Sequence, residues 1–243
     1  MINRVVCVCA LAAFPAMVSG QTLIDFSLDG GGSPLVNGQK LTGLEFSPEF
    51  TMSFGGSNQG GAIFDTSNPG PNVGGPDPDL LVSLGNALIL QSNDSPSITG
   101  GIFDTPNDSA RNDGLMRFDF ASPVELLDVT LIDVNGGNAI LVTLFDGQGR
   151  TRQYDVPQKW TNDISVAGGN GYGVLDLTTL LDQVAETAVV ATASESAGFD
   201  PTDVVALTFD YEGSGAIDNL RFVPAPGSVA LLLVGALAAR RRR

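Results

Sequence analysis

Hydrophobic and polar residues alternate one by one in short segments along most of the chain. Four such segments are rich in Phe, Val, Ile and Thr, and they lie at residues 50–54, 116–120, 140–144 and 207–211. A period of two places successive side chains on opposite faces, which is the pattern of a half-buried β-strand. We therefore expect an all-β protein.

Stretches rich in glycine and proline separate these segments, as at residues 29–32, 68–71 and 135–138. Such stretches form turns, and short strands joined by turns are typical of an antiparallel β-sandwich. We expect a jelly-roll-like arrangement of these strands. Residues 21–222 are enough for one domain of this kind, which buries about 70% of the surface of its unfolded chain.

One stretch departs from the strand pattern. Between residues 177 and 188 the apolar side chains recur at helical spacing, and neither Gly nor Pro interrupts them. Thr179 and Asp182 are spaced as a capping box at the start of a helix. We expect one short helix packed against the sandwich, and the alternative is a strand through residues 188–191.

The first twenty residues have the layout of a secretory signal peptide. Arg4 is followed by an apolar run over residues 5–14, and small residues at positions 18–20 precede Gln21. This order matches the basic, apolar and cleavage regions of such a peptide. We expect residues 1–20 to be removed on export, and the alternative is a buried N-terminal segment.

The other end of the chain also has three parts in order. Val223, Pro224, Ala225 and Pro226 are followed by an apolar run over residues 229–239 and by four terminal arginines, Arg240, Arg241, Arg242 and Arg243. A run this short falls below the roughly 20 residues that span a bilayer comfortably, and the arginines favour the cytoplasmic side. We expect a transient membrane contact through the tail, which a protease later releases. The alternative is a permanent anchor.

These three parts resemble the PEP-CTERM sorting signal, whose usual motif is Val-Pro-Glu-Pro. Here Ala225 stands in the place of Glu. The resemblance covers residues 223–243 and implies an apolar sorting helix, processing by an exosortase-type enzyme, and a final place at the cell surface or outside a bacterium that makes extracellular polysaccharide. Phrases within residues 63–89 and 213–222 also resemble the β-rich body common among exported proteins with this tail.

The amino-acid composition excludes several kinds of catalytic site and metal site. The chain has no His, and its two cysteines, Cys7 and Cys9, lie within the expected signal peptide. The mature protein would therefore have no Ser-His or Cys-His catalytic pair and no imidazole or thiolate metal ligand. With 12 basic and 27 acidic residues the net charge is −15, which argues against nucleic acid as a partner. Trimming both ends would remove five arginines and no acid, which leaves 7 basic and 27 acidic residues, or −20.

Some acidic residues are expected on the apolar face of a strand. Alternation puts Asp218 on the same side as Leu220 and Phe222, and Asp133 and Asp146 have similar positions on other predicted strands. A carboxylate that faces a core must be paired, protonated or bound to a metal ion.

Any metal ion in the mature protein would need oxygen ligands, which selects Ca²⁺. Two sites are considered. One joins Asp25 and Asp218 near the first and last strands, and the other joins Asp77, Asp79 and Asp113 with neighbouring Asn-Asp pairs. The alternative is that these acids are solvated loop residues.

Three functions remain in view. We expect an exported, non-catalytic surface or matrix protein associated with exopolysaccharide and stabilised by calcium. A carbohydrate-binding module is the alternative, with Trp160, Tyr154 and Tyr172 as the aromatic platform for a sugar. A glycoside hydrolase with two carboxylates is less favoured, because Glu45 and Glu49 are separated by a proline that disrupts a strand.

Overall fold

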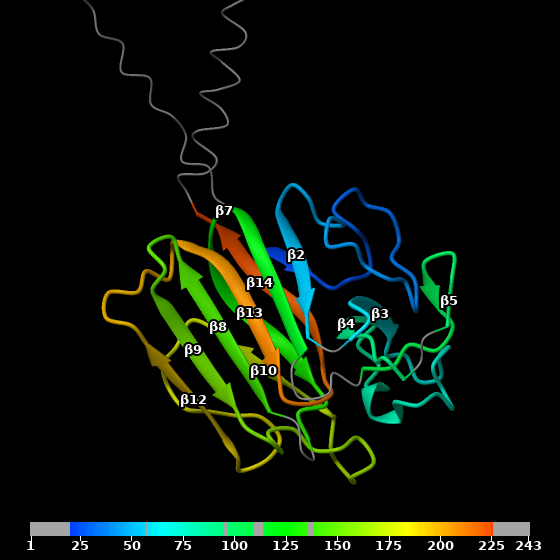
Figure 1. The fold of residues 1–243 in the computed structure, drawn as a ribbon. Helices are drawn as coiled ribbons and strands as arrows, with labels where there is room; N and C mark the ends of the chain where they lie inside the picture. Colours follow the sequence, from blue (N-terminus) through cyan, green and yellow to red (C-terminus); the bar gives the residue numbers. More distant parts are fainter. Residues whose placement is uncertain (1–19, 57, 95–96, 109–113, 136–138, 226–243) are drawn as a thin grey trace, which may run out of the picture.

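The computed structural model describes residues 20–56, 58–94, 97–108, 114–135 and 139–225 (Figure 1). Residues 1–19 of the expected signal peptide therefore lie outside the described residues. So do Asp113, Pro226, the apolar run of the tail and the four terminal arginines.

The described residues form fourteen strands and a single turn of 3-10 helix, η1, at Pro78–Leu80. The chain is all-β, as the alternating pattern predicted. The strands are β1 Thr22–Ile24, β2 Phe50–Gly55, β3 Gly61–Asp65, β4 Asn86–Leu90, β5 Ile98–Thr99, β6 Ile102–Phe103, β7 Gly114–Ile132, β8 Ile140–Asp146, β9 Thr151–Val156, β10 Tyr172–Asp176, β11 Gln183–Val184, β12 Val190–Glu195, β13 Val204–Tyr211 and β14 Ala216–Pro224. All four segments predicted from alternation lie within strands.

Twelve strands form one large antiparallel sheet. Its main order is β11-β12-β9-β8-β13-β7-β14-β4-β3, with β1 beside β14 and with β2 and β10 beside β7. The long strand β7 is shared: its first part pairs with β2 and β13, and its second part pairs with β14 and β10. Between them the register shifts, because Ala206 of β13 faces Asp119 of β7 while Val204 faces Val124. Such an irregularity bends a strand and increases its twist.

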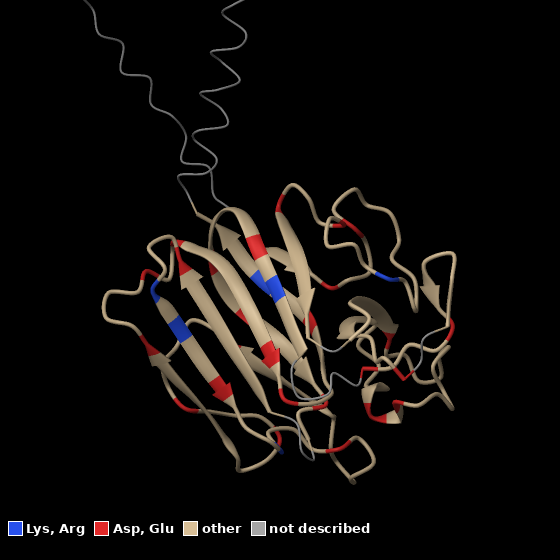
Figure 2. Ribbon diagram, in the orientation of Figure 1, with Lys and Arg blue, Asp and Glu red and all other residues tan. Residues whose placement is uncertain are grey.

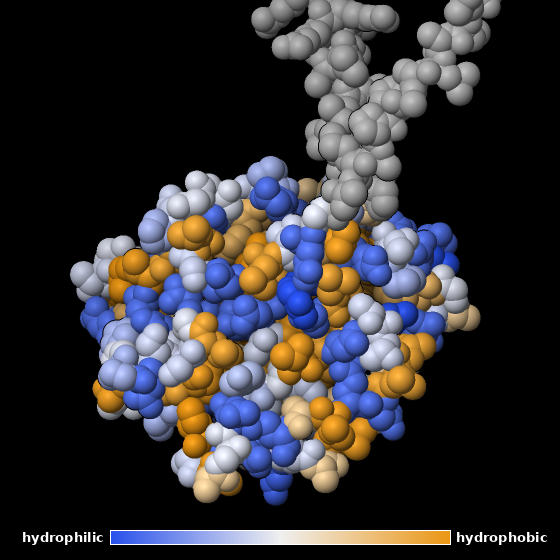
Figure 3. Space-filling model, turned by 180° about the vertical axis from the view of Figure 1, so that it is seen from behind, coloured by the Kyte–Doolittle hydropathy of each residue, from blue (hydrophilic) through white to orange (hydrophobic). Residues whose placement is uncertain are grey.

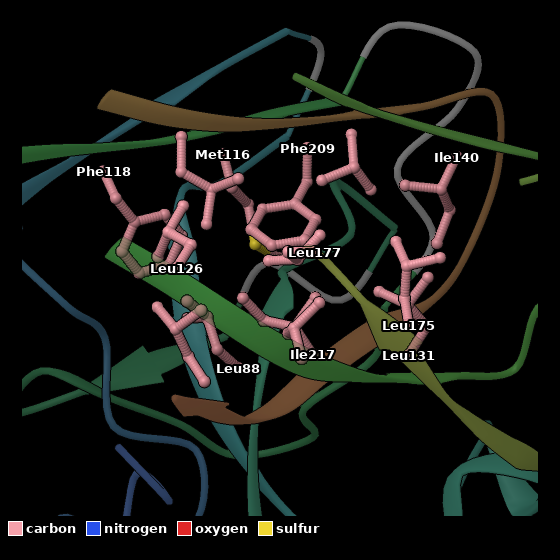
Figure 4. Packing of buried hydrophobic residues seen from close by; sticks show 14 of the residues in the cluster. Leu88, Met116, Phe118, Leu126, Leu131, Ile140, Leu175, Leu177, Phe209 and Ile217 are labelled. Carbon is pink, nitrogen blue, oxygen red and sulfur yellow. The ribbon is translucent and has the colours of Figure 1, made fainter. Parts of the chain in front are cut away.

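Side chains from both parts of the sheet pack into one hydrophobic core. Figure 4 shows Phe209 and Met116 on one side of this core and Leu131 and Ile217 on the other. Phe50 of β2 contacts the rings of Phe118 and Phe120 of β7, and that of Phe222 of β14 at 6.4 Å between ring centroids. Burial of a large apolar side chain stabilises a fold by roughly 1.5–3 kcal/mol, so this core is the main source of stability.

The prediction of a helix at residues 177–188 is wrong. This stretch contains turns and the short strand β11, whose Val184 pairs with Val190 of β12. The apolar residues at helical spacing do not share a buried face, because Leu177 is 1% exposed whereas Leu181 is 74% exposed. The Leu177 carbonyl instead accepts hydrogen bonds from Arg152 Nη1 at 3.1 Å and from the Tyr154 hydroxyl at 2.6 Å. Contacts with a distant strand thus override the local spacing.

The two ends of the described body lie side by side. Strand β1 pairs with β14, so that Thr22 faces Phe222 and Ile24 faces Leu220. Strand β14 continues to Pro224, and the Ala225 amide donates to the Pro123 carbonyl at 3.0 Å. The sheet thus extends beyond the domain end expected at residue 222 and takes in Val223 and Pro224 of the predicted motif. Within the described ranges, no helix has the length and hydropathy needed to cross a membrane.

Candidate functional site

Pairing of the first and last strands brings Asp25 and Asp218 into one neighbourhood. Asp218 lies within β14, and its side chain is fully buried together with Leu220 and Phe222, as strand alternation predicted. Both of its oxygens accept from Asn219, from the main-chain N–H at 2.6 Å and from Nδ2 at 2.8 Å. Asp25 follows β1 and is exposed, and its Oδ1 accepts from the Ser27 amide at 3.0 Å.

Burial raises the pKa of Asp218 to about 7 from the ordinary value of 3.8. The Asn219 amide lowers this pKa by donating to the carboxylate, and the negative charge of Asp25 raises it further. Asp25 directly follows Ile24, which pairs with Leu220 of β14, so Asp25 and Asp218 come from neighbouring strands. Ionising Asp218 near neutral pH therefore requires that a buried charge be compensated.

A second group of carboxyl groups lies among the loops around η1, where Figure 2 shows several acidic residues gathered. Asp77 Oδ2 accepts from the Asp108 amide at 2.9 Å, and Asp108 Oδ2 accepts from the Gly215 amide at 2.7 Å. Asp133 Oδ2 accepts from the Ser214 hydroxyl at 3.1 Å. Asp108 and Asp133 are each only 1% exposed.

These acids raise one another's pKa in addition to the effect of burial. Burial and then the charges of Asp77 and Asp133 hold the pKa of Asp108 well above 3.8. Burial and then the charge of Asp79 raise the pKa of Asp133 to about 8. Burial also raises the pKa of Asp77 to about 6, against a lowering by the Asp108 amide. The group thus favours a proton or a cation at neutral pH.

Tyr211 is a buried neighbour of this group. Its side chain is 1% exposed, and its hydroxyl has no hydrogen-bond partner among the described residues. Burial raises the pKa of Tyr211 above its ordinary value of 10, and the charge of Asp108 adds to this effect. A buried hydroxyl without a partner is unfavourable, so this corner of the fold is a polar site at which water or an ion would find a hydrogen-bonding group.

The sequence had joined Asp77 and Asp79 with Asp113, which lies outside the described residues. The structure instead places Asp77 beside Asp108. Asp108 sits in a loop, outside the alternating strand segments, so periodicity carried no signal for it. The donor set of these acids suits a hard cation such as Ca²⁺. Among the described residues, however, no three acidic side chains are grouped closely enough to form a ready-made metal site.

The third acidic residue predicted to face the core, Asp146, has a structural role. It is 1% exposed, and its Oδ2 forms an ion pair with Arg150 Nε at 2.6 Å. Burial alone would raise its pKa, but the hydrogen bonds donated by Arg150, Asp200 and Gln148 outweigh this and lower it below 3.8. Asp146 thus closes the turn between β8 and β9.

The three aromatic residues predicted as a sugar platform do not form one. Trp160 is fully buried, and its Nε1 donates to the Gln183 carbonyl at 3.1 Å. Tyr154 is 1% exposed, and Tyr172 is partly buried against a separate small core. Two of the three rings therefore offer no face to an external sugar, so the prediction for Trp160 and Tyr154 is wrong.

The two glutamates considered for hydrolysis lie in the loop before β2. The Glu45 carboxylate accepts from the amides of Thr42 at 2.6 Å and Gly43 at 2.9 Å, and it thereby closes a turn. Glu49 is exposed at the end of the same loop. Strand spacing therefore does not describe this pair, because neither residue lies in a strand.

No protein-family model matches the chain, and no curated protein shows a significant match to it.

Proposed function

We propose that this chain is an exported, non-catalytic protein of the cell surface or extracellular matrix, associated with extracellular polysaccharide. Its body is a jelly-roll-like β-sandwich delivered by the signal peptide and by the PEP-CTERM-like tail. An exosortase-type enzyme processes the tail after a transient contact with the inner membrane.

The pairing of β1 with β14 carries this proposal. Thr22 and Phe222 face each other in the sheet, so both chain ends leave the body at the same place. Strand β1 begins at Thr22 and β14 ends at Pro224, so a cut before Thr22 and a cut after Pro224 remove no residue of these two strands. A domain whose first and last strands pair with each other is compatible with proteolytic removal of both ends and with attachment to a membrane through the C-terminal tail.

Mass spectrometry of the protein from fractionated producing cells tests the proposal. We expect a mature chain that begins near Gln21, lacks the terminal arginines and is found at the cell surface or in the medium. A variant in which residues 240–243 are all serine should remain unprocessed, while Lys159→Ser, which removes an exposed basic side chain from the body, should be processed normally. Intact protein from Met1 to Arg243 in the soluble cell interior would contradict the proposal.

Calcium belongs to this proposal as a stabilising ion outside the cell. The observation that supports it is the burial of Asp218 and Asp108, whose charges need compensation once the protein meets neutral pH. The candidate ligands are Asp25 with Asp218 and Asp77 with Asp79 and Asp108. The expected mature chain has no His or Cys side chain to bind a transition metal ion. Ca²⁺ would compensate the buried negative charges through oxygen ligands alone.

A further inference from the structure

An open pocket of about 420 Å³ lies beside β1. It shares Asp25 with the Asp25–Asp218 pair described above and lies apart from the second acidic group. The loop after β1 and the loop before β2 form its walls. Its volume falls within the range of about 300–1,000 Å³ that organic ligands occupy in proteins. Strand pairing of β1 with β14 holds one wall in place, so the pocket is built on the sheet.

Apolar residues form part of the lining of this β1 pocket. Phe46 and Phe50 line it as a stacked pair, with ring centroids 5.0 Å apart and planes inclined by 13°. Leu23 and Leu28 also line it, and they remain 51% and 50% exposed. On the face of the molecule seen in Figure 3, patches of hydrophobic residues lie between hydrophilic ones. Half-exposed leucines at a pocket offer apolar area that a ligand can cover.

All the charged side chains that line the β1 pocket are acidic. Asp25, Asp29 and Glu49 line it, and neither Lys nor Arg does. Asp29 Oδ1 accepts from the amides of Gly31 at 2.9 Å and Ser33 at 2.8 Å. The main-chain bonds to Asp25 and Asp29 thus use only Oδ1, which leaves Oδ2 of each for a ligand. Three carboxylates beside an apolar surface are complementary to an organic cation.

The lining of the pocket favours a ligand that carries an amino group on an apolar ring or chain. A bare metal ion would need a shell of oxygens at 2.3–2.6 Å, and the leucines and phenylalanines contribute nothing to it. An acidic polysaccharide would be repelled by the excess of 27 acidic over 12 basic residues. A sugar with a free amino group presents an ammonium group and an apolar ring face together.

We propose that the β1 pocket binds a protonated amino sugar of an extracellular polysaccharide. This inference rests on the proposed function, because it names the class of polysaccharide that the protein contacts. The ammonium group is held by Asp25, Asp29 and Glu49, and the ring lies against Leu23 and Leu28.

Isothermal titration calorimetry with the purified full chain tests the ligand class. The probe is a tetramer of glucosamine, compared at low ionic strength with the fully N-acetylated tetramer and with tetralysine. We expect the glucosamine tetramer to bind at least tenfold more tightly than either comparison ligand, because acetylation removes the charge and lysine lacks the ring. Equal binding of the acetylated tetramer or of tetralysine, or no binding of the glucosamine tetramer, would overturn the inference.

Two single-charge variants locate the site. Glu49→Gln removes a carboxylate from the pocket, and Asp155→Asn removes an exposed one from β9. We expect Glu49→Gln to weaken binding about tenfold and Asp155→Asn to change it less than twofold. Equal weakening by both would show attraction by overall charge and would overturn the inference. Trp160 fluorescence checks that both variants are folded.

The two proposals fail separately. Correct export and processing without binding of the glucosamine tetramer would overturn the β1 pocket inference alone. Binding of the tetramer by a chain that stays intact inside the cell would support the pocket and contradict the proposed export.

Discussion

The buried carboxyl group of Asp218 makes the stability of this protein depend on pH in a predictable direction. Its pKa is raised to about 7 in the folded state, against an ordinary value of 3.8. The unfolded chain therefore gives up this proton first as the pH rises. The contribution of Asp218 to stability is fully present below pH 3.8, declines as the pH rises and is lost above about pH 7.

The size of the effect follows from the shift in pKa. One pKa unit corresponds to about 1.4 kcal/mol, and the folded state holds the Asp218 proton across most of the interval between pH 5 and pH 8. Asp218 is therefore expected to lower the free energy of unfolding by roughly 2–3 kcal/mol over this interval. Asp77, Asp108 and Asp133 act in the same direction, because their pKa values are also raised.

The perturbation that isolates this contribution is Asp218→Asn. Asparagine keeps an oxygen that accepts from the Asn219 amide, but it does not titrate. Between pH 5 and pH 8 the free energy of unfolding should fall by roughly 2–3 kcal/mol less in the variant than in the wild type. Asp155→Asn, which removes an exposed charge, should keep the slope of the wild type.

Urea unfolding at several pH values in this range measures the effect. Trp160 is fully buried and is the sole tryptophan, so its fluorescence reports the unfolding of the core. A chelator is present throughout, so that no divalent cation can take the place of the proton. Equal pH slopes for the wild type and Asp218→Asn would refute the reasoning, as would greater stability of the wild type at pH 8 than at pH 5.

Other predictions concern the second acidic group, the backbone and calcium. Asp108→Ala leaves the buried Gly215 amide without its acceptor and should cost about 1–3 kcal/mol in urea unfolding at pH 5, whereas Asp108→Asn keeps an acceptor and should cost less. Gly43→Ala would put a Cβ 2.0 Å from the Met52 carbonyl at a φ of +93°, so we expect a loss above about 2 kcal/mol; Gly32→Ala, at φ +82° with open space, should lose only about 1 kcal/mol. Millimolar Ca²⁺ should raise the melting temperature at pH 8 relative to a chelator, and an unchanged value in calorimetry would contradict the calcium proposal.

The acidic residues show how far local pattern reaches. Asp218, Asp133 and Asp146 were expected on the apolar side of a strand, and each is 1% exposed or less. Asp218 and Asp146 lie in strands as predicted, whereas Asp133 follows the end of β7 with a φ of +62°. The same pattern could not show that Arg150 neutralises Asp146, or that Asp108 arrives beside Asp77 from a loop 31 residues later along the chain. Partners of this kind are set by the path of the chain in space.

For the aromatic residues and the expected helix, the local sequence pattern gave the wrong prediction. Trp160 was considered as a surface platform, but it fills the core and bonds to the Gln183 carbonyl. Residues 177–188 have helical spacing, yet Arg152 and Tyr154 of β9 bind the Leu177 carbonyl and hold this stretch outside a helix. In both cases a contact between residues at least 23 positions apart in the sequence decided the outcome.

The amino-acid sequence by itself determined the all-β class, the places of the main strands and the inward direction of Asp146 and Asp218. These properties depend on a two-residue period, which each segment carries without reference to the others. Only the tertiary structure decided the strand order, the sharing of β7 between two parts of the sheet, the grouping of carboxyl groups and the β1 pocket. These depend on contacts such as that between Thr22 and Phe222, whose free energy is realised only when distant segments of the chain pack together.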